Sequence, residues 1–175
     1  AGSVIHAVND DQDIRKMGGL SNYVPFTHML MIVGTISLMG FPFTAGYYSK
    51  DAIIESAYLA SSGFSSYAFI IGLLGVVMTS FYSWRLIFLT FNGPIRVNEK
   101  DIPNIHESPN VMLLPLIVLA IGALFSGFFF KDFFIGSGAE SFWGDSIALH
   151  YHDHHHIPFL IYYAPMILGF LGLFL

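Results

Sequence analysis

Long apolar segments separated by polar loops make up most of this 175-residue chain. An α-helix needs about 20 predominantly apolar residues to cross a bilayer, and four segments reach or approach that length. They cover residues 25–59, 67–91, 111–130 and 157–175. None shows the strict polar–apolar alternation of a transmembrane β-strand. The pattern predicts an all-α integral membrane protein, with a bundle of about four transmembrane helices in a single membrane domain over residues 1–175.

The first segment is interrupted near its middle. Residues 40–51 read GFPFTAGYYSKD, which places Gly40, Pro42 and Gly46 close together in an otherwise apolar stretch. Proline removes a backbone donor and clashes with the preceding turn of a helix. Broken helices survive in a bilayer only where protein or a water-filled cavity covers the freed backbone groups. We predict a discontinuous first helix whose break is a hinge or water-access point; a simple packing kink is the alternative.

Three polar loops precede or separate the segments, besides a short Ser/Gly turn at 60–66, and their basic residues are distributed unevenly. We name them the N-terminal loop (residues 9–22), the central loop (92–110) and the long polar loop (131–156). The first two, which successive spans would put on the same side, carry Arg15, Lys16, Arg96 and Lys100. The opposite side receives only Lys131. Because basic residues favour the inner side of a membrane, the N-terminal and central loops are predicted on the cytoplasmic or matrix side.

Composition supports a membrane protein and excludes several activities. Charged residues make up 11% of the chain, against about 25% in soluble domains, and the mean hydropathy is +0.63. Cysteine is absent, so the chain offers no disulfide, catalytic thiol or iron–sulfur ligand. The sequence has no glycine-rich phosphate loop or dinucleotide fingerprint and no basic–aromatic pattern for nucleic acid. An initial Ala and a final apolar run lead us to expect a fragment or split subunit.

Lys50 is the first candidate for a role in proton transfer, and two interpretations stand. If the helix were continuous, the 25 residues from Pro25 to Lys50 would span about 37 Å, longer than the hydrocarbon core of about 30 Å. Lys50 would then lie at the far interface. If the break takes several residues off the helical path, Lys50 stays near the midplane. A buried ammonium gives up its proton readily because burial disfavours the charged form, which suits a proton relay.

Two acidic residues and one histidine extend this hypothesis. Asp51 and Glu55 share one helix face at i, i+4, whereas Lys50 and Asp51 are sequence neighbours and do not face each other. The two carboxylates form either a proton exit or a solvated acidic helix end. His28, near a helix start, is either an interfacial histidine or a further relay.

A histidine-rich tract lies in the long polar loop. His152, His154, His155 and His156 fall within six residues of His150. Such tracts bind zinc or copper, but adventitious binding is the alternative. We expect no functional metal site here.

Three motifs together resemble one family. They read GSVIHA and DQDIRKMGGL (residues 2–7 and 11–20), GFPFTAGYYSKD (40–51), and FYS, RL and LTF (81–83, 85–86 and 89–91). These stretches resemble the corresponding stretches of subunit 5 (subunit L in bacteria) of the proton-pumping NADH:quinone oxidoreductase, respiratory complex I. That family has Glu at the position of Asp11, a change that keeps the charge. The resemblance is specific over residues 1–93 and weak over residues 137–175.

The resemblance implies proton translocation by one antiporter-like subunit, coupled to NADH oxidation and quinone reduction elsewhere in the complex. Lys50 would end the central chain of charges in the membrane, and Asp51 would be its partner or exit acid. The resemblance implies no cofactor in this chain, with NADH, flavin, iron–sulfur clusters and quinone in other subunits. Expected partners are other membrane subunits, especially neighbouring antiporter-like ones, and the lipid bilayer. Expected locations are the mitochondrial inner membrane or the bacterial plasma membrane.

Three other functions remain open at this point. The first is a subunit of a multisubunit sodium/proton antiporter, which the same resemblance covers. The second is a non-conducting membrane scaffold, in which Lys50 and Asp51 serve assembly. The third is a metal transporter that depends on the histidine-rich tract.

Overall fold

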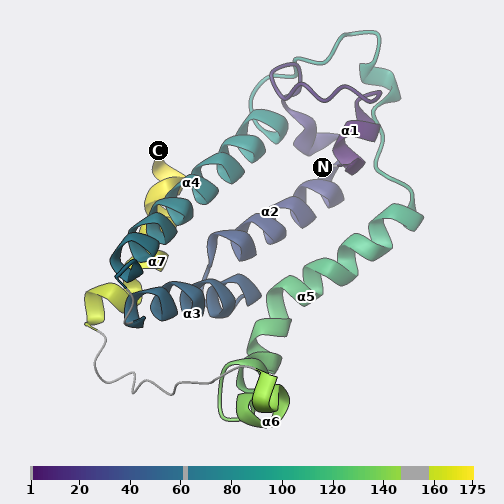
Figure 1. Ribbon diagram of the computed structural model, residues 1–175. Coiled ribbons are helices and arrows are strands. Elements are labelled where there is room, and N and C mark those ends of the chain that lie inside the picture. Colours follow the sequence, from purple (N-terminus) through teal and green to yellow (C-terminus); the bar gives the residue numbers. More distant parts are fainter. Residues whose placement is uncertain (1, 61–62, 147–157) are drawn as a thin grey trace. The chain divides into compact units, whose positions relative to one another are not determined.

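The computed structural model describes residues 2–60, 63–146 and 158–175 (Figure 1). Its α-helices are α1 (Gly2–Ala7), α2 (Pro25–Met39), α3 (Ala45–Leu59), α4 (Ser65–Phe91), α5 (Asn110–Phe134), α6 (Ala139–Trp143) and α7 (Phe159–Phe174). Short 3₁₀ helices are η1 (Leu20–Asn22), η2 (Ile102–Asn104) and η3 (Gly144–Ser146). No β-strand occurs in the described residues. The all-helical fold is therefore confirmed for this part of the chain.

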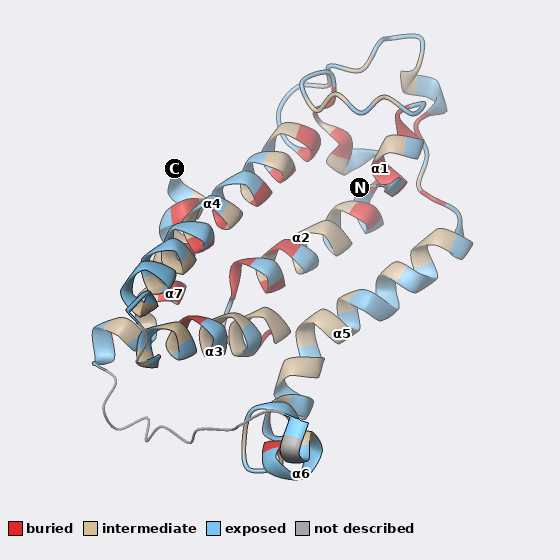
Figure 2. Cartoon of the chain, viewed as in Figure 1, coloured by how far each residue is buried: buried red, intermediate tan, exposed pale blue. Residues whose placement is uncertain are grey.

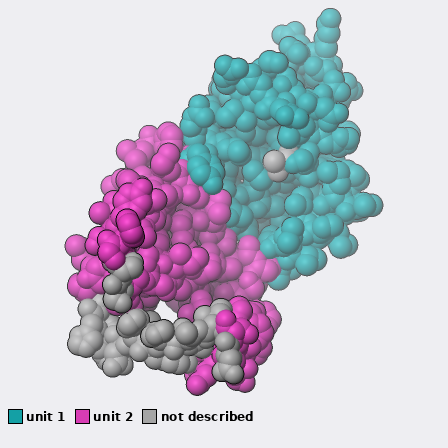
Figure 3. Space-filling view, in the orientation of Figure 1, with its two compact units in different colours: residues 1–35, 82–121 teal, residues 36–81, 122–175 magenta. Residues whose placement is uncertain are grey.

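The chain divides into two compact units (Figure 3). Unit 1 comprises residues 1–35 and 82–121, and unit 2 comprises residues 36–81 and 122–175. Helices α2, α4 and α5 each contribute residues to both units.

Unit 1 is built around a buried apolar cluster. Leu20 from η1 and Phe91 at the end of α4 have no exposed surface. The other buried members are Val4, Ala7, Val8, Met17, Val24, Ile87 and Ile105. They come from α1 and the residue after it, the N-terminal loop, the residue before α2, α4 and the central loop. Burial of this cluster therefore ties both predicted basic-side loops to one apolar core.

Polar contacts join the same two loops. The Arg96 guanidinium, in the central loop, donates to the Met17 carbonyl at 2.5 Å and to the Leu89 carbonyl at 2.6 Å. The amide of Gly19 donates to the Asn92 carbonyl at 3.2 Å. Arg96 thereby also supplies a donor to one of the last carbonyls of α4, which have no partner within the helix.

In unit 2, α7 packs against α3 and α4. The buried Ser80 hydroxyl of α4 donates to the Gly169 carbonyl of α7 at 2.6 Å. Tyr47 of α3 and Tyr162 of α7 interact through their side chains, and these two helices are in contact.

Helices α4 and α5 are long and apolar enough to cross a membrane. Their most apolar stretches have mean hydropathies of 1.6 and 2.5, and only 22% and 6% of those stretches is buried. Figure 2 shows α5 without a buried residue. The core helix of a soluble protein would be mostly buried, so this exposed apolar surface suits a lipid environment. Helices α2 and α7 are also apolar but shorter.

Candidate functional site

The interruption of the first apolar segment lies between α2, which ends at Met39, and α3, which begins at Ala45. The Phe41 amide donates to the Ile36 carbonyl and the Gly40 amide to the Ser37 carbonyl, both at 3.1 Å. This pair of bonds is a Schellman motif, which needs a left-handed residue directly after the helix. Gly40 supplies it with φ +86°. The sequence therefore ends α2 at a defined residue rather than bending it.

Residues 40–44 form the link between the two helices, and one of them is strained. Phe43 has φ +71° and a side chain that is 71% exposed. A bulky residue in this left-handed conformation costs about 1–3 kcal/mol. The Phe41 carbonyl accepts from both the hydroxyl and the amide of the buried Thr44, at 2.6 Å and 3.1 Å. Thr44 therefore satisfies one of the backbone groups that the break frees.

Lys50 lies in the second turn of α3, and its side chain returns to the end of α2. Its ammonium group donates to the Leu38 carbonyl at 3.3 Å, and the residue is half-buried. The last carbonyls of a helix lack internal partners and carry the negative end of the helix dipole. The break thus creates an electronegative carbonyl for Lys50, which a continuous helix would not offer.

Close backbone packing holds the two helix ends in this arrangement. A Cβ atom on Gly46 would lie 1.8 Å from the Ser37 carbonyl oxygen, so only glycine fits between α3 and the last turn of α2. The buried Ser37 hydroxyl donates to the Ala123 carbonyl of α5 at 3.1 Å. Gly127 of α5 packs directly on Ala45 at the start of α3. The Lys50 contact is therefore supported by three helix segments.

The predicted acidic residues also lie on α3. Asp51 and Glu55 are half-buried and one helical turn apart. Among the described residues, Lys50 and Asp51 form no ion pair with one another. As sequence neighbours, they do not face each other on the helix. The structure thus brings Lys50, Asp51 and Glu55 onto one short helix beside the break.

His28, the remaining candidate, belongs to unit 1. Its ring stacks on Phe91 with centroids 4.5 Å apart and an interplanar angle of 23°. The structure therefore gives His28 a packing partner in the apolar cluster.

The histidine-rich tract at 150–156 lies outside the described residues. Within the described residues, no group of three or more His, Asp or Glu side chains is arranged to hold a metal ion.

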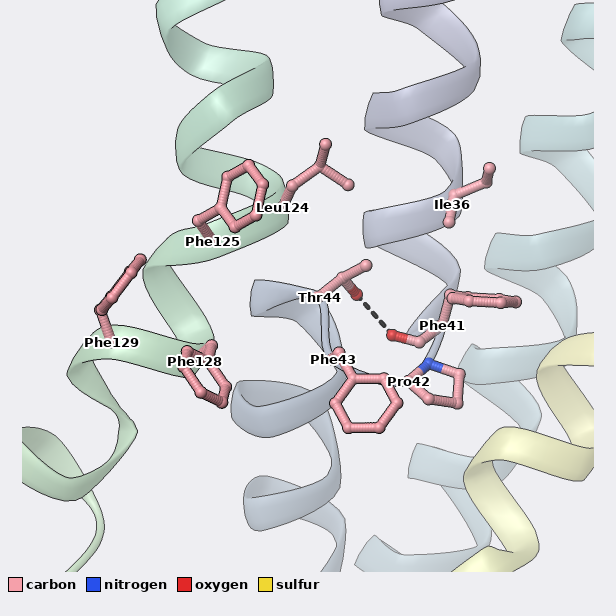
Figure 4. A pocket seen from close by; sticks show the side chains of 9 residues that line it. All are labelled: Ile36, Phe41, Pro42, Phe43, Thr44, Leu124, Phe125, Phe128 and Phe129. Atoms are coloured by element: carbon pink, nitrogen blue, oxygen red, sulfur yellow. Dashed lines mark hydrogen bonds between the residues drawn. The ribbon is translucent and has the colours of Figure 1, made fainter.

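An apolar cavity of about 600 Å³ adjoins the break (Figure 4). Its lining residues are Ile36, Phe41, Pro42, Phe43, Thr44, Leu124, Phe125, Phe128 and Phe129. Thr44 alone among them has a polar side chain, and Figure 4 shows its hydroxyl bonded to the Phe41 carbonyl. The cavity therefore offers no free side-chain polar group for proton transfer or for binding a polar ligand.

One contact was missed from the sequence, and it lies at the opposite end of α2. The Glu107 carboxylate accepts from the Phe26 amide at 2.9 Å, the Thr27 amide at 3.4 Å and the Thr27 hydroxyl at 2.5 Å. The residue before Pro25 is Val24, which has no side-chain acceptor to cap the helix. The missing cap is a local signal, but nothing in the sequence says which distant residue supplies it.

Two family models match consecutive parts of the chain. Residues 1–79 match the family model described as NADH:quinone oxidoreductase/Mrp antiporter, TM, and residues 82–138 match the model of the NADH dehydrogenase subunit 5 C-terminus. The chain is 48% identical to NADH-ubiquinone oxidoreductase chain 5 of Marchantia polymorpha over 85% of its length, and 41% identical to that of Chondrus crispus over 99%. These alignments cover 22% and 28% of the relatives, so the chain spans about a quarter of their length.

Proposed function

Since the chain belongs to the NADH-ubiquinone oxidoreductase chain 5 family, we propose that it carries part of a proton path through an antiporter-like subunit of that complex. The observation that carries the proposal is the Lys50 ammonium at the helix break, bonded to the Leu38 carbonyl. The match to the subunit 5 C-terminal model favours this function over a sodium/proton antiporter subunit. NADH oxidation and quinone reduction would take place in other subunits, which would hold the flavin and iron–sulfur clusters.

Helix lengths support four membrane spans. Helices α4 and α5 have 27 and 25 residues and would measure about 40 Å and 37 Å, more than the hydrocarbon core of about 30 Å. Helices α2 and α3 have 15 residues each, about 22 Å, so neither crosses alone. Together they would form one discontinuous span, and α7 would belong to a fourth.

The depth of Lys50 follows from its partner rather than from its sequence position. Leu38 lies 13 residues after Pro25 along α2, a rise of about 20 Å. The hydrogen bond to the Leu38 carbonyl holds the ammonium near that level along α2. If the hydrocarbon core begins at Pro25, that level would lie inside its thickness of about 30 Å. A continuous helix would have carried Lys50 beyond it. The contact therefore favours the proton-relay interpretation over an interfacial lysine.

The other predicted residues receive supporting roles in this proposal. Asp51 and Glu55 would accept the proton from Lys50 and pass it toward the side opposite the basic loops. Gly40, Pro42 and Gly46 would keep the break open to water. His28 would serve proton access from the basic side.

Orientation, location and partners belong to the same proposal. The N-terminal and central loops share unit 1 and contact each other through Arg96 and Met17, which supports a common side, the matrix or cytoplasm. We infer a mitochondrial inner membrane because the compared relatives are eukaryotic proteins named for ubiquinone. Other membrane subunits of the complex, neighbouring antiporter-like ones above all, would be its partners.

The test compares three lysine variants in the full-length subunit, assembled in sealed membrane vesicles. Lys50→Ala removes the charge. Lys50→Arg keeps a donor for the Leu38 carbonyl but cannot release a proton. Lys100→Ala, at an exposed position of the central loop, is the control. We expect both Lys50 variants to assemble and to move fewer protons per NADH oxidised, while Lys100→Ala pumps normally.

Two results would contradict the proposal. If both Lys50 variants pump normally, Lys50 is outside the proton path. If Lys50→Ala fails to assemble while Lys50→Arg assembles and pumps normally, the lysine serves structure through its charge, as in a scaffold.

A further inference from the structure

The first turn of α2 is capped from a distance. The Phe26 and Thr27 amides occupy the second and third helical positions, where an ordinary cap would accept from them. Their acceptor is Glu107, about 80 residues further along the chain, at 2.9 Å and 3.4 Å. Pro25 at the first position has no amide to satisfy. The Glu107 carboxylate thus replaces the local cap that Val24 cannot provide.

The contact is more elaborate than a simple cap. The hydroxyl of Thr27, which is 2% exposed, donates to the second carboxylate oxygen at 2.5 Å. The Ser108 amide donates to that same oxygen at 3.4 Å. The half-buried carboxylate thus accepts on both oxygens at the positive end of the α2 dipole, a position that favours an acidic side chain. Its contacts tie the first turn of α2 to the central loop.

The same helix has an opposite charge at its other end. The Lys50 ammonium bonds the Leu38 carbonyl in the last turn of α2. An α-helix resists axial compression and slippage, so a shift of its first turn is transmitted to its last carbonyls. The position of the Leu38 carbonyl therefore depends on what fixes the first turn, in addition to the local packing of Gly46 on Ser37.

We propose that Glu107 is a positioning residue for proton translocation: it fixes α2 through Phe26 and Thr27 and so keeps the Leu38 carbonyl within reach of Lys50. This inference rests on the proposed role of Lys50. Loss of the Glu107 charge would let α2 shift and would uncouple proton movement from electron transfer without removing any group of the relay.

The experiment uses the full-length subunit in the assembled complex and measures protons moved per NADH oxidised, at matched amounts of complex. Glu107→Gln removes the charge, and Glu107→Asp keeps it on a shorter side chain. Glu99→Gln, at an exposed acid of the same loop, is the control, and Lys50→Ala is measured alongside. We expect Glu107→Gln to lose about as much of the proton ratio as Lys50→Ala does, and Glu107→Asp to recover part of it.

The outcomes separate the two proposals. A normal ratio in Glu107→Gln with a reduced ratio in Lys50→Ala overturns the role of Glu107 and leaves the function of Lys50 standing. Normal ratios in both variants overturn both proposals. A ratio reduced equally in Glu107→Gln and Glu99→Gln reflects general charge loss and also overturns the role of Glu107.

A second pair of variants decides the matter if Glu107→Gln does not assemble. Thr27→Val removes the hydroxyl donor to Glu107 and keeps the side-chain shape, whereas Thr27→Ser keeps the hydroxyl. A lower proton ratio in Thr27→Val that Thr27→Ser restores supports the proposal. Equal, normal ratios in both overturn it.

Discussion

Replacing Gly46 by alanine tests the packing that holds the helix break. The new Cβ would lie 1.8 Å from the Ser37 carbonyl oxygen, whereas real Cβ contacts essentially never fall below 3.0 Å. Helices α2 and α3 would have to separate by more than an ångström. Overpacking of this kind costs about 1–3 kcal/mol, and a clash with backbone falls at the upper end. Gly46 is the second residue of α3, so the helix-propensity gain is at most the value of about 1 kcal/mol for a helix interior, and the net loss is about 2 kcal/mol or more.

Gly34→Ala is the matched control, because Gly34 is also helical but has nothing within 4 Å of its would-be Cβ. It gains about 1 kcal/mol of helix propensity without a clash. Thermal denaturation of the purified full-length protein should therefore give a lower midpoint for Gly46→Ala and an equal or higher one for Gly34→Ala. A Gly46→Ala midpoint at or above that of Gly34→Ala would refute the close packing of α3 on α2.

Two further predictions concern the loops of unit 1. Arg96→Gln removes the charged donor to the Met17 and Leu89 carbonyls and should lower the free energy of unfolding by about 1–3 kcal/mol. Arg96→Lys, which keeps the charge but loses the forked geometry, should fall between wild type and Gln in thermal denaturation, and a wild-type midpoint for Gln would contradict the contact. The hydrogen bonds from Arg15 lower the pKa of Asp13 from 3.8 to about 2. Because this pKa is lower in the folded state, its stabilising contribution is present above pH 4 and is lost as the pH falls toward 2. Carboxyl-carbon NMR should show Asp13 titrating near 2 and Arg15→Gln returning it toward 3.8, and an unchanged value in the variant would exclude Arg15 as the cause.

Local sequence signals account for the helices and for the place of the break. Apolar runs of sufficient length gave the segments, and the Gly40, Pro42 and Gly46 cluster marked where α2 stops and α3 starts. The end of α2 and the start of α3 are set by residues that are adjacent in sequence, so composition and punctuation reveal them. The conformations of Gly40 and Phe43 were not predicted, although glycine after a helix is a known signal for the former.

Contacts between distant residues could not be read in the same way. Glu107 reaches Thr27, and Arg96 reaches Met17, across about 80 residues. Periodicity carries no information on which loop meets which helix end. The sequence left the depth of Lys50 undecided for the same reason, since helical rise measures distance only along an unbroken helix.

The two ends of α2 explain why a broken helix suits a charge inside a membrane. A buried ammonium is costly unless a partner offsets its desolvation. In the interior of a continuous helix, each carbonyl accepts from the amide four residues further on, so no unpaired carbonyl is present at mid-membrane depth. Ending α2 at Met39 frees the Leu38 carbonyl for Lys50, and Glu107 supplies the opposite charge at the first turn. Each charge complements the helix dipole at its own end. In the proposed proton path, the neutral Leu38 carbonyl would hold the ammonium in place without the strong ion pair that would oppose release of its proton.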